Sequence, residues 1–208
     1  MVTKIEEPII VQGNQDKNEL GMTHIITGDG KGKTTASLGL ALRAVGNNYS
    51  VYIIQFLKSG GTGEMYAAKH LPNLSIVQYG VDAIKERKAK QMRLTELSEK
   101  DTTGRFTFNP DSAERDAATE GFIHAKNIIA SQRYDIVILD EVNCVADKGF
   151  IPTEEIITLM KSTGKTELLL TGRDAPEELY EHADYVSVVD RVKHPWDKRI
   201  KARKGIEY

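Results

Sequence analysis

The stretch of sequence that decides the fold is Thr27-Gly28-Asp29-Gly30-Lys31-Gly32-Lys33-Thr34-Thr35. It lies between an apolar run at 24–27, which predicts a strand, and a mostly apolar segment at 35–45, which predicts a well-buried helix. Glycines in such a loop let successive backbone N–H groups form a concave anion site, and the helix N-terminus adds partial positive charge. The stretch therefore predicts a phosphate-binding P-loop, in which Lys33 contributes a mobile charge and Thr34 a hydroxyl ligand for Mg²⁺.

The loop departs from the usual P-loop pattern at one position. Thr27 stands where Gly or Ala is usual, and Gly28 follows one residue later. The alternative interpretation is a glycine-rich turn that carries lysines by chance.

A second signal is the apolar run Ile136-Val137-Ile138-Leu139, which ends in the acidic pair Asp140-Glu141. A continuous apolar run is typical of a strand covered on both faces. At the carboxyl end of a parallel strand the two carboxylates face the P-loop crevice, as in a Walker B element. We therefore expect Asp140 and Glu141 to hold Mg²⁺ directly or through water; the alternative is an acidic strand end without a metal. Together the two motifs predict a nucleoside triphosphate site without specifying its reaction.

Apolar runs alternate with amphipathic stretches along the rest of the chain. Further strands are predicted at 51–57, 74–79, 136–139, 168–170 and 185–189, a loop at 60–63, and helices after Asp111, at 152–164 and at 174–181. This alternation predicts an α/β fold: a mostly parallel sheet with helices on both faces, P-loop NTPase-like and RecA-like. We expect residues 1–21 to form an N-terminal arm and residues 22–208 a single domain.

The composition excludes several classes of protein. The 208 residues, 40% of them hydrophobic, suit one globular domain, and the net charge of −2 does not favour nucleic-acid binding. The single cysteine, Cys144, excludes an intramolecular disulfide framework and a Cys-rich zinc site. Neither a membrane span nor a secretory signal is expected, so the predicted location is the cytoplasm. Two basic segments, 85–105 and 191–204, are either solvated faces or, for the second, a tail over an anionic ligand.

Other polar and aromatic residues leave alternatives open. Gln55 and Glu64 are candidates for positioning water, although Gln55 is equally suited to a structural role. The histidines lack metal-ligand spacing, and His124 is expected to be a satisfied core residue. Phe106 and Phe108 lie in an irregular stretch before a helix, so they either plug into the core or face a ligand.

At this point the chain resembles the P-loop type of ATP:corrinoid adenosyltransferase, which acts on cob(I)yrinic acid a,c-diamide or cob(I)alamin. The resemblance runs from about Met22 to the C-terminus, and only the combination of its segments is specific. Those segments are 27–36, 43–46, Gln55-Phe56-Leu57-Lys58, Gly63-Glu64, Leu139-Asp140-Glu141, Thr171-Gly172-Arg173, Ala183-Asp184, Val192-Lys193-His194-Pro195 and Lys204-Gly205-Ile206-Glu207-Tyr208. The form of the loop around Thr27 is itself typical of this family.

The resemblance implies an adenosyl transfer rather than a hydrolysis. Co(I) of a reduced corrinoid attacks the 5′ carbon of ATP, and the whole triphosphate leaves. ATP is implied to bind in the reverse sense to most P-loop proteins. By position, Lys33, Thr34 and Glu141 are implied to be catalytic, and Thr34, Asp140 and Glu141 to hold Mg²⁺. The implied ATP-binding residues are Gly28, Asp29, Gly30, Lys31, Gly32, Lys33, Thr34 and Thr35.

The resemblance also implies a corrinoid site and partners. Phe106 and Phe108 are implied to pack against the lower face of the corrinoid (cobalamin, cobinamide or cobyrinic acid diamide) and to exclude its lower ligand. Asp29 and Phe108 depart from relatives, which often carry Asn and Trp there. A homodimer, an N-terminal arm over the neighbouring site and a reduced flavoprotein electron donor are implied as well. The competing interpretations are another P-loop phosphotransferase or ATPase, which releases ADP, and a regulatory nucleotide-binding module.

Overall fold

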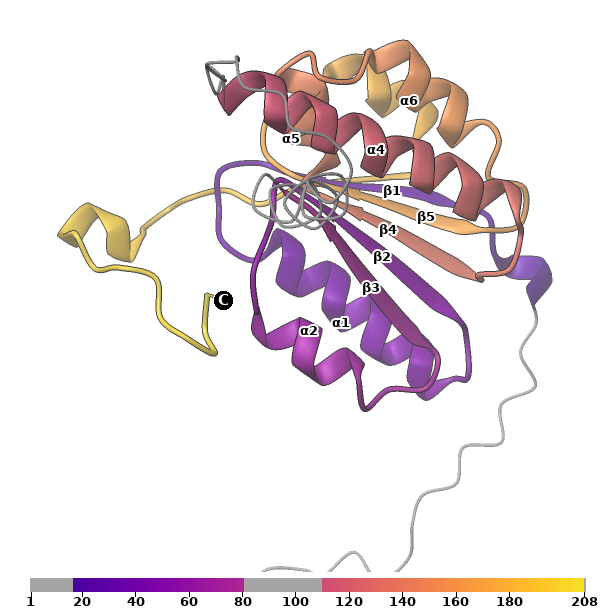
Figure 1. Ribbon diagram of the computed structural model, residues 1–208, viewed down its shortest axis with the longest axis horizontal. Helices are drawn as coiled ribbons and strands as arrows, with labels where there is room; N and C mark the ends of the chain where they lie inside the picture. Colours follow the sequence, from indigo (N-terminus) through magenta and orange to yellow (C-terminus); the bar gives the residue numbers. More distant parts are fainter. Residues whose placement is uncertain (1–16, 81–109, 208) are drawn as a thin grey trace, which may run out of the picture.

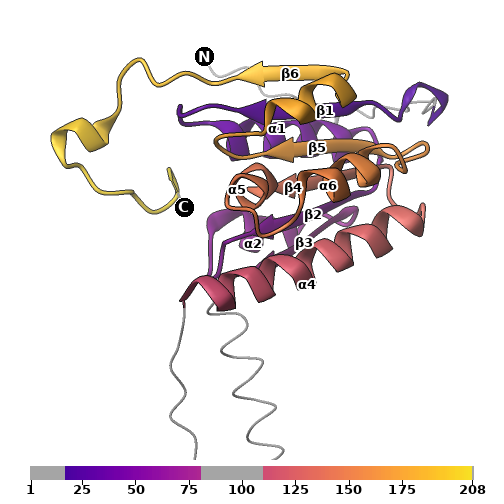
Figure 2. The same cartoon turned by 90° about the horizontal axis from the view of Figure 1, so that it is seen from above.

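The computed structural model describes residues 17–80 and 110–207. Six parallel strands form one sheet in the order β3-β2-β4-β5-β1-β6 (Figures 1 and 2). Their bounds are β1 Thr23–Thr27, β2 Val51–Phe56, β3 Leu74–Tyr79, β4 Ile136–Asp140, β5 Glu167–Thr171 and β6 Tyr185–Val188. The α/β fold class with a parallel sheet is therefore confirmed.

Helices cover both faces of this sheet. Helices α1 (Lys33–Gly46) and α2 (Gly63–Ala68) lie on one face, and α4 (Pro110–Ala130), α5 (Val142–Asp147) and α6 (Thr153–Met160) lie on the other (Figure 1). Because side chains alternate across a strand, each helical layer packs on its own set of strand residues. Ile53, Ile138 and Leu169 pack toward α1, whereas Ile54, Leu139 and Leu170 belong to the larger core under α4, α5 and α6.

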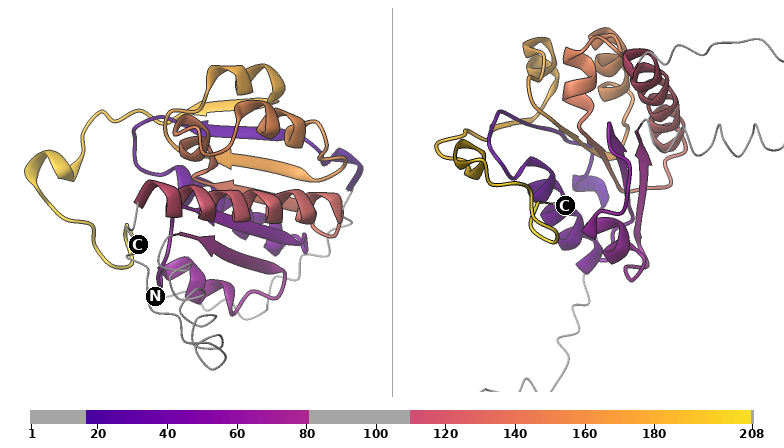
Figure 3. Two further views of the ribbon diagram at one scale, coloured as in Figure 1. Left: turned by 45° about the horizontal axis from the view of Figure 1, so that its top comes forward. Right: turned by 60° about the vertical axis from the view of Figure 1, so that its left-hand side comes forward.

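The carboxyl ends of the parallel strands meet at one edge of the sheet, and this edge positions the site. The register pairs Gln55 of β2 with Asp140 of β4. The chain crosses from β1 through α1 to β2, so the loop before α1 lies beside the ends of β4 and β5. Short 3₁₀ helices, η2 (Glu177–His182) and η3 (Pro195–Lys198), flank β6. After β6 the chain leaves the sheet and returns toward α1 and α2 (Figure 3).

Several predicted elements differ in detail from the structure. Helix α1 begins at Lys33 and buries only one side, since Leu42 is 60% exposed. Helix α4 begins at Pro110, which suits a first helical turn because proline lacks an N–H, so Asp111 is not its cap. The loop at 60–63 leads into the unpredicted helix α2, and α5 was likewise not predicted. The helix at 174–181 is the shorter η2, and the last strand ends at Val188.

Candidate functional site

The glycine-rich loop is fixed by the end of the edge strand β6. The amide of Gly30 donates a 2.6 Å hydrogen bond to the carbonyl of Val189. A Cβ atom at Gly30 would lie 2.6 Å from that same oxygen and 2.7 Å from the carbonyl oxygen of Asp190. The close approach of two backbones therefore requires glycine here, in addition to any requirement set by a phosphate.

Lys33 opens α1, and its side chain folds back into the loop. Its Nζ donates to the carbonyls of Gly28, at 2.5 Å, and Gly30, at 2.8 Å. Burial lowers the pKa of this lysine, while the Glu141 carboxylate acts in the opposite direction and Arg173 lowers the pKa further. The arrangement places an ammonium inside a ring of backbone groups, where a phosphate oxygen is an effective alternative partner.

Asp140, at the end of β4, is the centre of a buried hydrogen-bond network. Its Oδ1 accepts from the hydroxyls of Thr34 (2.8 Å) and Thr171 (2.6 Å). Its Oδ2 accepts from Gln55 Nε2 (3.0 Å) and Lys58 Nζ (2.5 Å). A carboxylate has about four lone-pair sites, so these donors saturate it. Asp140 therefore acts through the groups that it holds.

Glu141 follows in a left-handed backbone conformation, with φ of 65°. Its amide donates to Thr171 Oγ1 at 3.2 Å, and its Oε2 accepts from the Cys144 thiol at 3.0 Å. Burial, and then the hydrogen bond to Glu141, raises the pKa of Cys144 to about 12, so the thiol remains protonated as a donor. A non-glycine residue in this conformation is a strained feature of the kind found at functional sites.

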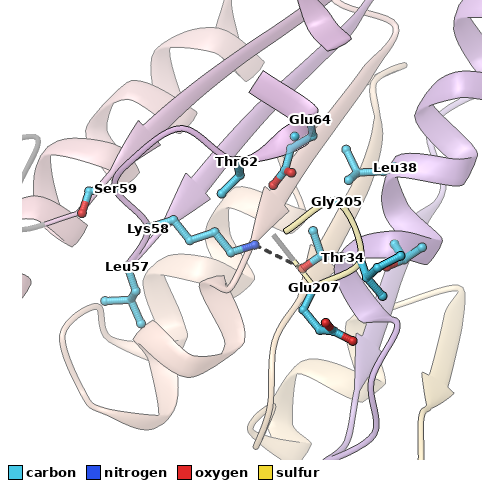
Figure 4. Close-up of a pocket in the computed structure, with 12 residues that line it drawn as sticks. Thr34, Leu38, Leu57, Lys58, Ser59, Thr62, Glu64, Gly205 and Glu207 are labelled. Atoms are coloured by element: carbon cyan, nitrogen blue, oxygen red, sulfur yellow. Dashed lines mark hydrogen bonds between the residues drawn. The ribbon is translucent and has the colours of Figure 1, made fainter. Parts of the chain in front are cut away.

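Two adjoining cavities lie over the loop. The one on the loop itself has a volume of about 290 Å³, and its lining includes Lys33, Glu141, Arg173 and His194. The larger one, of about 560 Å³, lies between α1 and the segment after β2. Figure 4 shows Thr34, Leu38, Lys58 and Glu64 around the larger cavity, with Gly205 and Glu207 of the C-terminal tail beside them. Thr34 and Lys58 line both cavities, so the two form one continuous region.

The oxygen atoms at this place are suitable ligands for a small, hard divalent cation. Thr34 gives its proton to Asp140, so the lone pairs of its oxygen remain for a cation. Glu141 lines the same cavity and adds a carboxylate. Within residues 17–80 and 110–207 there is no cluster of three or more His, Cys, Asp or Glu that could hold a metal. Mg²⁺ suits such a sparse set, because it typically takes one or two carboxylates and completes its shell with phosphates and water.

Comparisons with known proteins identify the family. The description "ATP:corrinoid adenosyltransferase BtuR/CobO/CobP" belongs to the family profile that matches residues 19–208. The chain belongs to the ATP:corrinoid adenosyltransferase family. The corrinoid adenosyltransferase of Escherichia coli K12 is 32% identical over 209 residues, which cover 99% of this chain and 94% of that protein.

Other members of the family are similar over nearly the same length. Corrinoid adenosyltransferase CobA of Salmonella typhimurium is 31% identical over 99% of this chain and 94% of that protein. The corrinoid adenosyltransferase of Pseudomonas aeruginosa is 26% identical over 93% of this chain and 87% of that protein. The predicted activity, ATP-dependent adenosylation of corrinoids in cobalamin biosynthesis or salvage, is confirmed at the level of the family. The phosphotransferase, ATPase and regulatory-module interpretations are therefore set aside.

The structure brings most of the predicted adenosyltransferase site residues to one place. Residues 29–35 and Glu141 line the cavity on the loop, and Asp140 lies buried beneath Thr34. Gly28 lines a third cavity, of about 570 Å³, on the side of the loop near Asp190. Phe106 and Phe108, predicted to contact the corrinoid, lie outside the described residues.

Three residues with charged side chains at the cavities had no predicted role: Lys58, Arg173 and Glu207. Lys58 and Arg173 follow the ends of β2 and β5. The signal was available in part, because polar residues directly after parallel strands share the carboxyl edge of the sheet. Glu207 could not be placed this way, since it lies on a tail without regular pairing. Its pKa is lowered to about 2 by hydrogen bonds from Arg203.

The structure bears on Gln55, His124 and the basic segment 191–204, whereas the basic segment 85–105 lies outside the described residues. Gln55 is fully buried, and its side chain contacts Asp140, Glu64 and Gln78, so the structural role is the one observed. His124 bonds the hydroxyls of Tyr52 and Tyr79, as expected for a satisfied core histidine. The seven basic side chains within 191–204 are exposed, while His194, Ile206 and Glu207 reach the cavity. In the described part of the chain, no helix is long and apolar enough to cross a membrane.

Proposed function

We propose that the paired cavities bind ATP as its Mg²⁺ complex and that the protein acts by positioning substrates and neutralising charge. Co(I) of a reduced corrinoid attacks the 5′ carbon of ATP. The Co–C bond forms as the C5′–O bond breaks, and the electron pair of that bond leaves with the triphosphate. The observation that carries the proposal is the concentration of positive charge on one cavity: Lys31, Lys33 and Arg173 line it together with the glycine-rich loop. Such preorganised charge stabilises a leaving anion most effectively in a partly dry site.

The chemistry of the nearby side chains supports transfer to the corrinoid rather than to a protein nucleophile. Cys144 is the single thiol of the chain, and its high pKa keeps it protonated at neutral pH. Lys33 donates hydrogen bonds to two carbonyls of the glycine-rich loop, where we propose that the phosphates of ATP bind. Because the reduced cobalt is itself the nucleophile, the protein has only to orient the substrates and stabilise charge.

Thr34 and Glu141, with Asp140 in support, are the proposed Mg²⁺-binding residues. When bound, Mg²⁺ supplies positive charge that stabilises the departing triphosphate. Thr34 would hold it through the hydroxyl oxygen whose proton Asp140 accepts. Binding of ATP in the reverse sense, with the γ-phosphate in the cradle, would leave the 5′ carbon accessible to the corrinoid.

The corrinoid side of the site rests on the family resemblance. Phe106 and Phe108 are proposed to pack against the lower face of the corrinoid and to displace its lower ligand, which makes Co(II) easier to reduce. The corrinoid substrate is cobalamin, cobinamide or cobyrinic acid diamide. A homodimer, a reduced flavoprotein donor and a cytoplasmic location complete the proposal.

An anaerobic assay with ATP, Mg²⁺ and chemically reduced cob(I)alamin tests this function. The expected products are light-sensitive adenosylcobalamin and intact triphosphate. Formation of ADP without adenosylation would contradict the proposal. Phe106→Ala is expected to leave ATP affinity near the wild-type value and to slow turnover of corrinoids that carry a lower ligand. A parallel loss of ATP affinity would place Phe106 at the nucleotide instead.

A further inference from the structure

Lys58 occupies a position that the proposed function does not use. It follows β2, directly after Leu57, whose backbone is left-handed with φ of 55°. From there its ammonium reaches across the carboxyl edge of the sheet to the end of β4. Its Nζ lies 2.5 Å from Asp140 Oδ2. It also lies 3.3 Å from Thr34 Oγ1, the contact that Figure 4 marks with a dashed line.

The contact with Asp140 answers an electrostatic need. The Asp140 side chain is 1% exposed, and a buried carboxylate is costly unless its charge is compensated. The other donors to Asp140, the side chains of Thr34, Thr171 and Gln55, are all neutral. Lys58 contributes the positive charge of this network.

The same contact competes with a divalent cation. A hydroxyl oxygen that gives its proton to Asp140 has only its lone pairs left, and Lys58 uses one of them. Mg²⁺ binds its ligands at about 2.0–2.1 Å and repels an ammonium held on the same oxygen. A cation bound at Thr34 therefore competes with the observed position of Lys58.

The surroundings give Lys58 another place to go. Its side chain is 26% exposed and lines both cavities, including the one formed by the loop amides. A lysine side chain is long and flexible, so a short rotation would carry its charge from Asp140 into the region proposed for the polyphosphate.

We propose that Lys58 is a displaceable counter-ion of the metal site. It pairs with Asp140 and Thr34 until a divalent cation binds, and it then turns into the cavity toward the polyphosphate. This inference rests on the proposed function, because it takes Thr34 as a metal-binding residue. It adds Lys58 as a positioning residue that couples metal binding to polyphosphate binding.

Binding of Mn²⁺, followed by electron paramagnetic resonance without nucleotide, tests the competition. Lys58→Met is expected to bind Mn²⁺ about 10- to 100-fold more tightly than the wild type, the range expected when one charged hydrogen bond no longer has to be broken. Metal-free ATP is expected to bind this variant more weakly. Lys31→Met is the matched control, since Lys31 is an exposed lysine on the same cavity. It removes an equal charge and should change Mn²⁺ affinity only about twofold to threefold, as a screened surface charge does.

Chemical acetylation of the wild-type protein, read by mass spectrometry, tests the displacement directly and needs no variant. Acetylation of Lys58 is expected to be slow in EDTA, severalfold faster with saturating Mn²⁺, and slow again with Mn²⁺ and ATP. Lys126, paired with Glu155 on the surface, should react at one rate throughout.

Unchanged or weaker Mn²⁺ affinity in Lys58→Met, or a Lys58 acetylation rate insensitive to Mn²⁺, would overturn the inference alone, provided the wild type binds Mn²⁺. A wild type that binds no Mn²⁺, with or without ATP, would overturn the metal assignment and this inference together. The corrinoid assay on the same sample then reports separately on the adenosyl transfer.

Discussion

Replacing Thr34 by Val, with Thr171→Val as its matched partner, separates the metal-binding role of a hydroxyl from its structural role. Both hydroxyls donate to the same oxygen, Oδ1 of Asp140, at 2.8 and 2.6 Å. Thr34 also lines the cavities, whereas Thr171 is 0% exposed. Valine keeps the shape of threonine and removes only the hydrogen bonds.

The expected magnitudes follow from those bonds. Thr34→Val loses one hydrogen bond to a charged acceptor, which lowers the free energy of unfolding by about 1.5–3 kcal/mol. It also removes the 3.3 Å contact from Lys58, but that part-exposed ammonium keeps its pair with Asp140. Thr171→Val loses the same kind of bond and also leaves the Glu141 amide, 3.2 Å from Oγ1, without its acceptor, which adds about 1–3 kcal/mol. Thr171→Val is therefore the less stable variant, and Thr34→Val is the less active one.

Denaturant unfolding and the anaerobic corrinoid assay measure the two effects. Thr34→Val should raise the Mg²⁺ concentration for half-maximal rate about 10- to 100-fold, corresponding to the loss of one charged interaction. Thr34→Ser should restore it, while Thr171→Val, assayed below its melting temperature, should stay near the wild type. The reasoning is refuted if folded Thr171→Val needs as high a Mg²⁺ concentration for half-maximal rate as Thr34→Val does. A disturbed position of Asp140 would then explain the effect of both substitutions.

Three further results are expected. Lys33→Ala should abolish adenosyl transfer and ATP binding, because it removes the ammonium that lies in the loop; retained ATP affinity in a calorimetric titration would contradict this. Burial alone would raise the pKa of Glu167, but hydrogen bonds from His24 and two backbone amides outweigh it and lower the pKa. The stabilisation is therefore present above the unfolded-state pKa of about 4.3 and lost as pH falls through the lower folded value. Glu167→Gln should cost more unfolding free energy at pH 7 than at pH 3; an equal cost would disprove it. Gly121→Ala should destabilise the protein by about 1–3 kcal/mol despite alanine's helix propensity, because its Cβ would lie 2.8 Å from the Phe56 ring; a raised melting temperature would refute this.

Much of the fold followed from local sequence because its signals are local. The loop at 27–35 and the run at 136–141 each carry a pattern whose cause lies in adjacent residues: glycine conformation, helix polarity and two-sided burial. The order of strands did not follow, because β1 pairs with β5 and β6 from the far end of the chain. Short elements such as α5 were missed since six residues hold too little periodicity.

The candidate site shows the same division. Thr34 and Asp140 were placed from their motifs, and the 2.8 Å contact between them agrees with the expectation that Asp140 faces the P-loop crevice. Lys58 belongs to a segment typical of the family, but its reach to Asp140 depends on the register of β2 against β4 and on a left-handed residue before it. Neither is visible in residue types. The position of Lys58 depends on pairing between strands that are far apart in the sequence, so composition could not predict it.

The close approach of Gly30 to the end of β6 changes how loop variants should be interpreted. A survey of mutational tolerance would find glycine obligatory here and attribute this to the nucleotide. Yet the backbone of Val189 by itself leaves no room for a Cβ at Gly30. We therefore expect a substitution at Gly30 to impair folding of the chain as well as nucleotide binding. A screen that measures only enzymatic turnover does not distinguish loss of folded protein from loss of binding. A screen that also measures the amount of folded protein does.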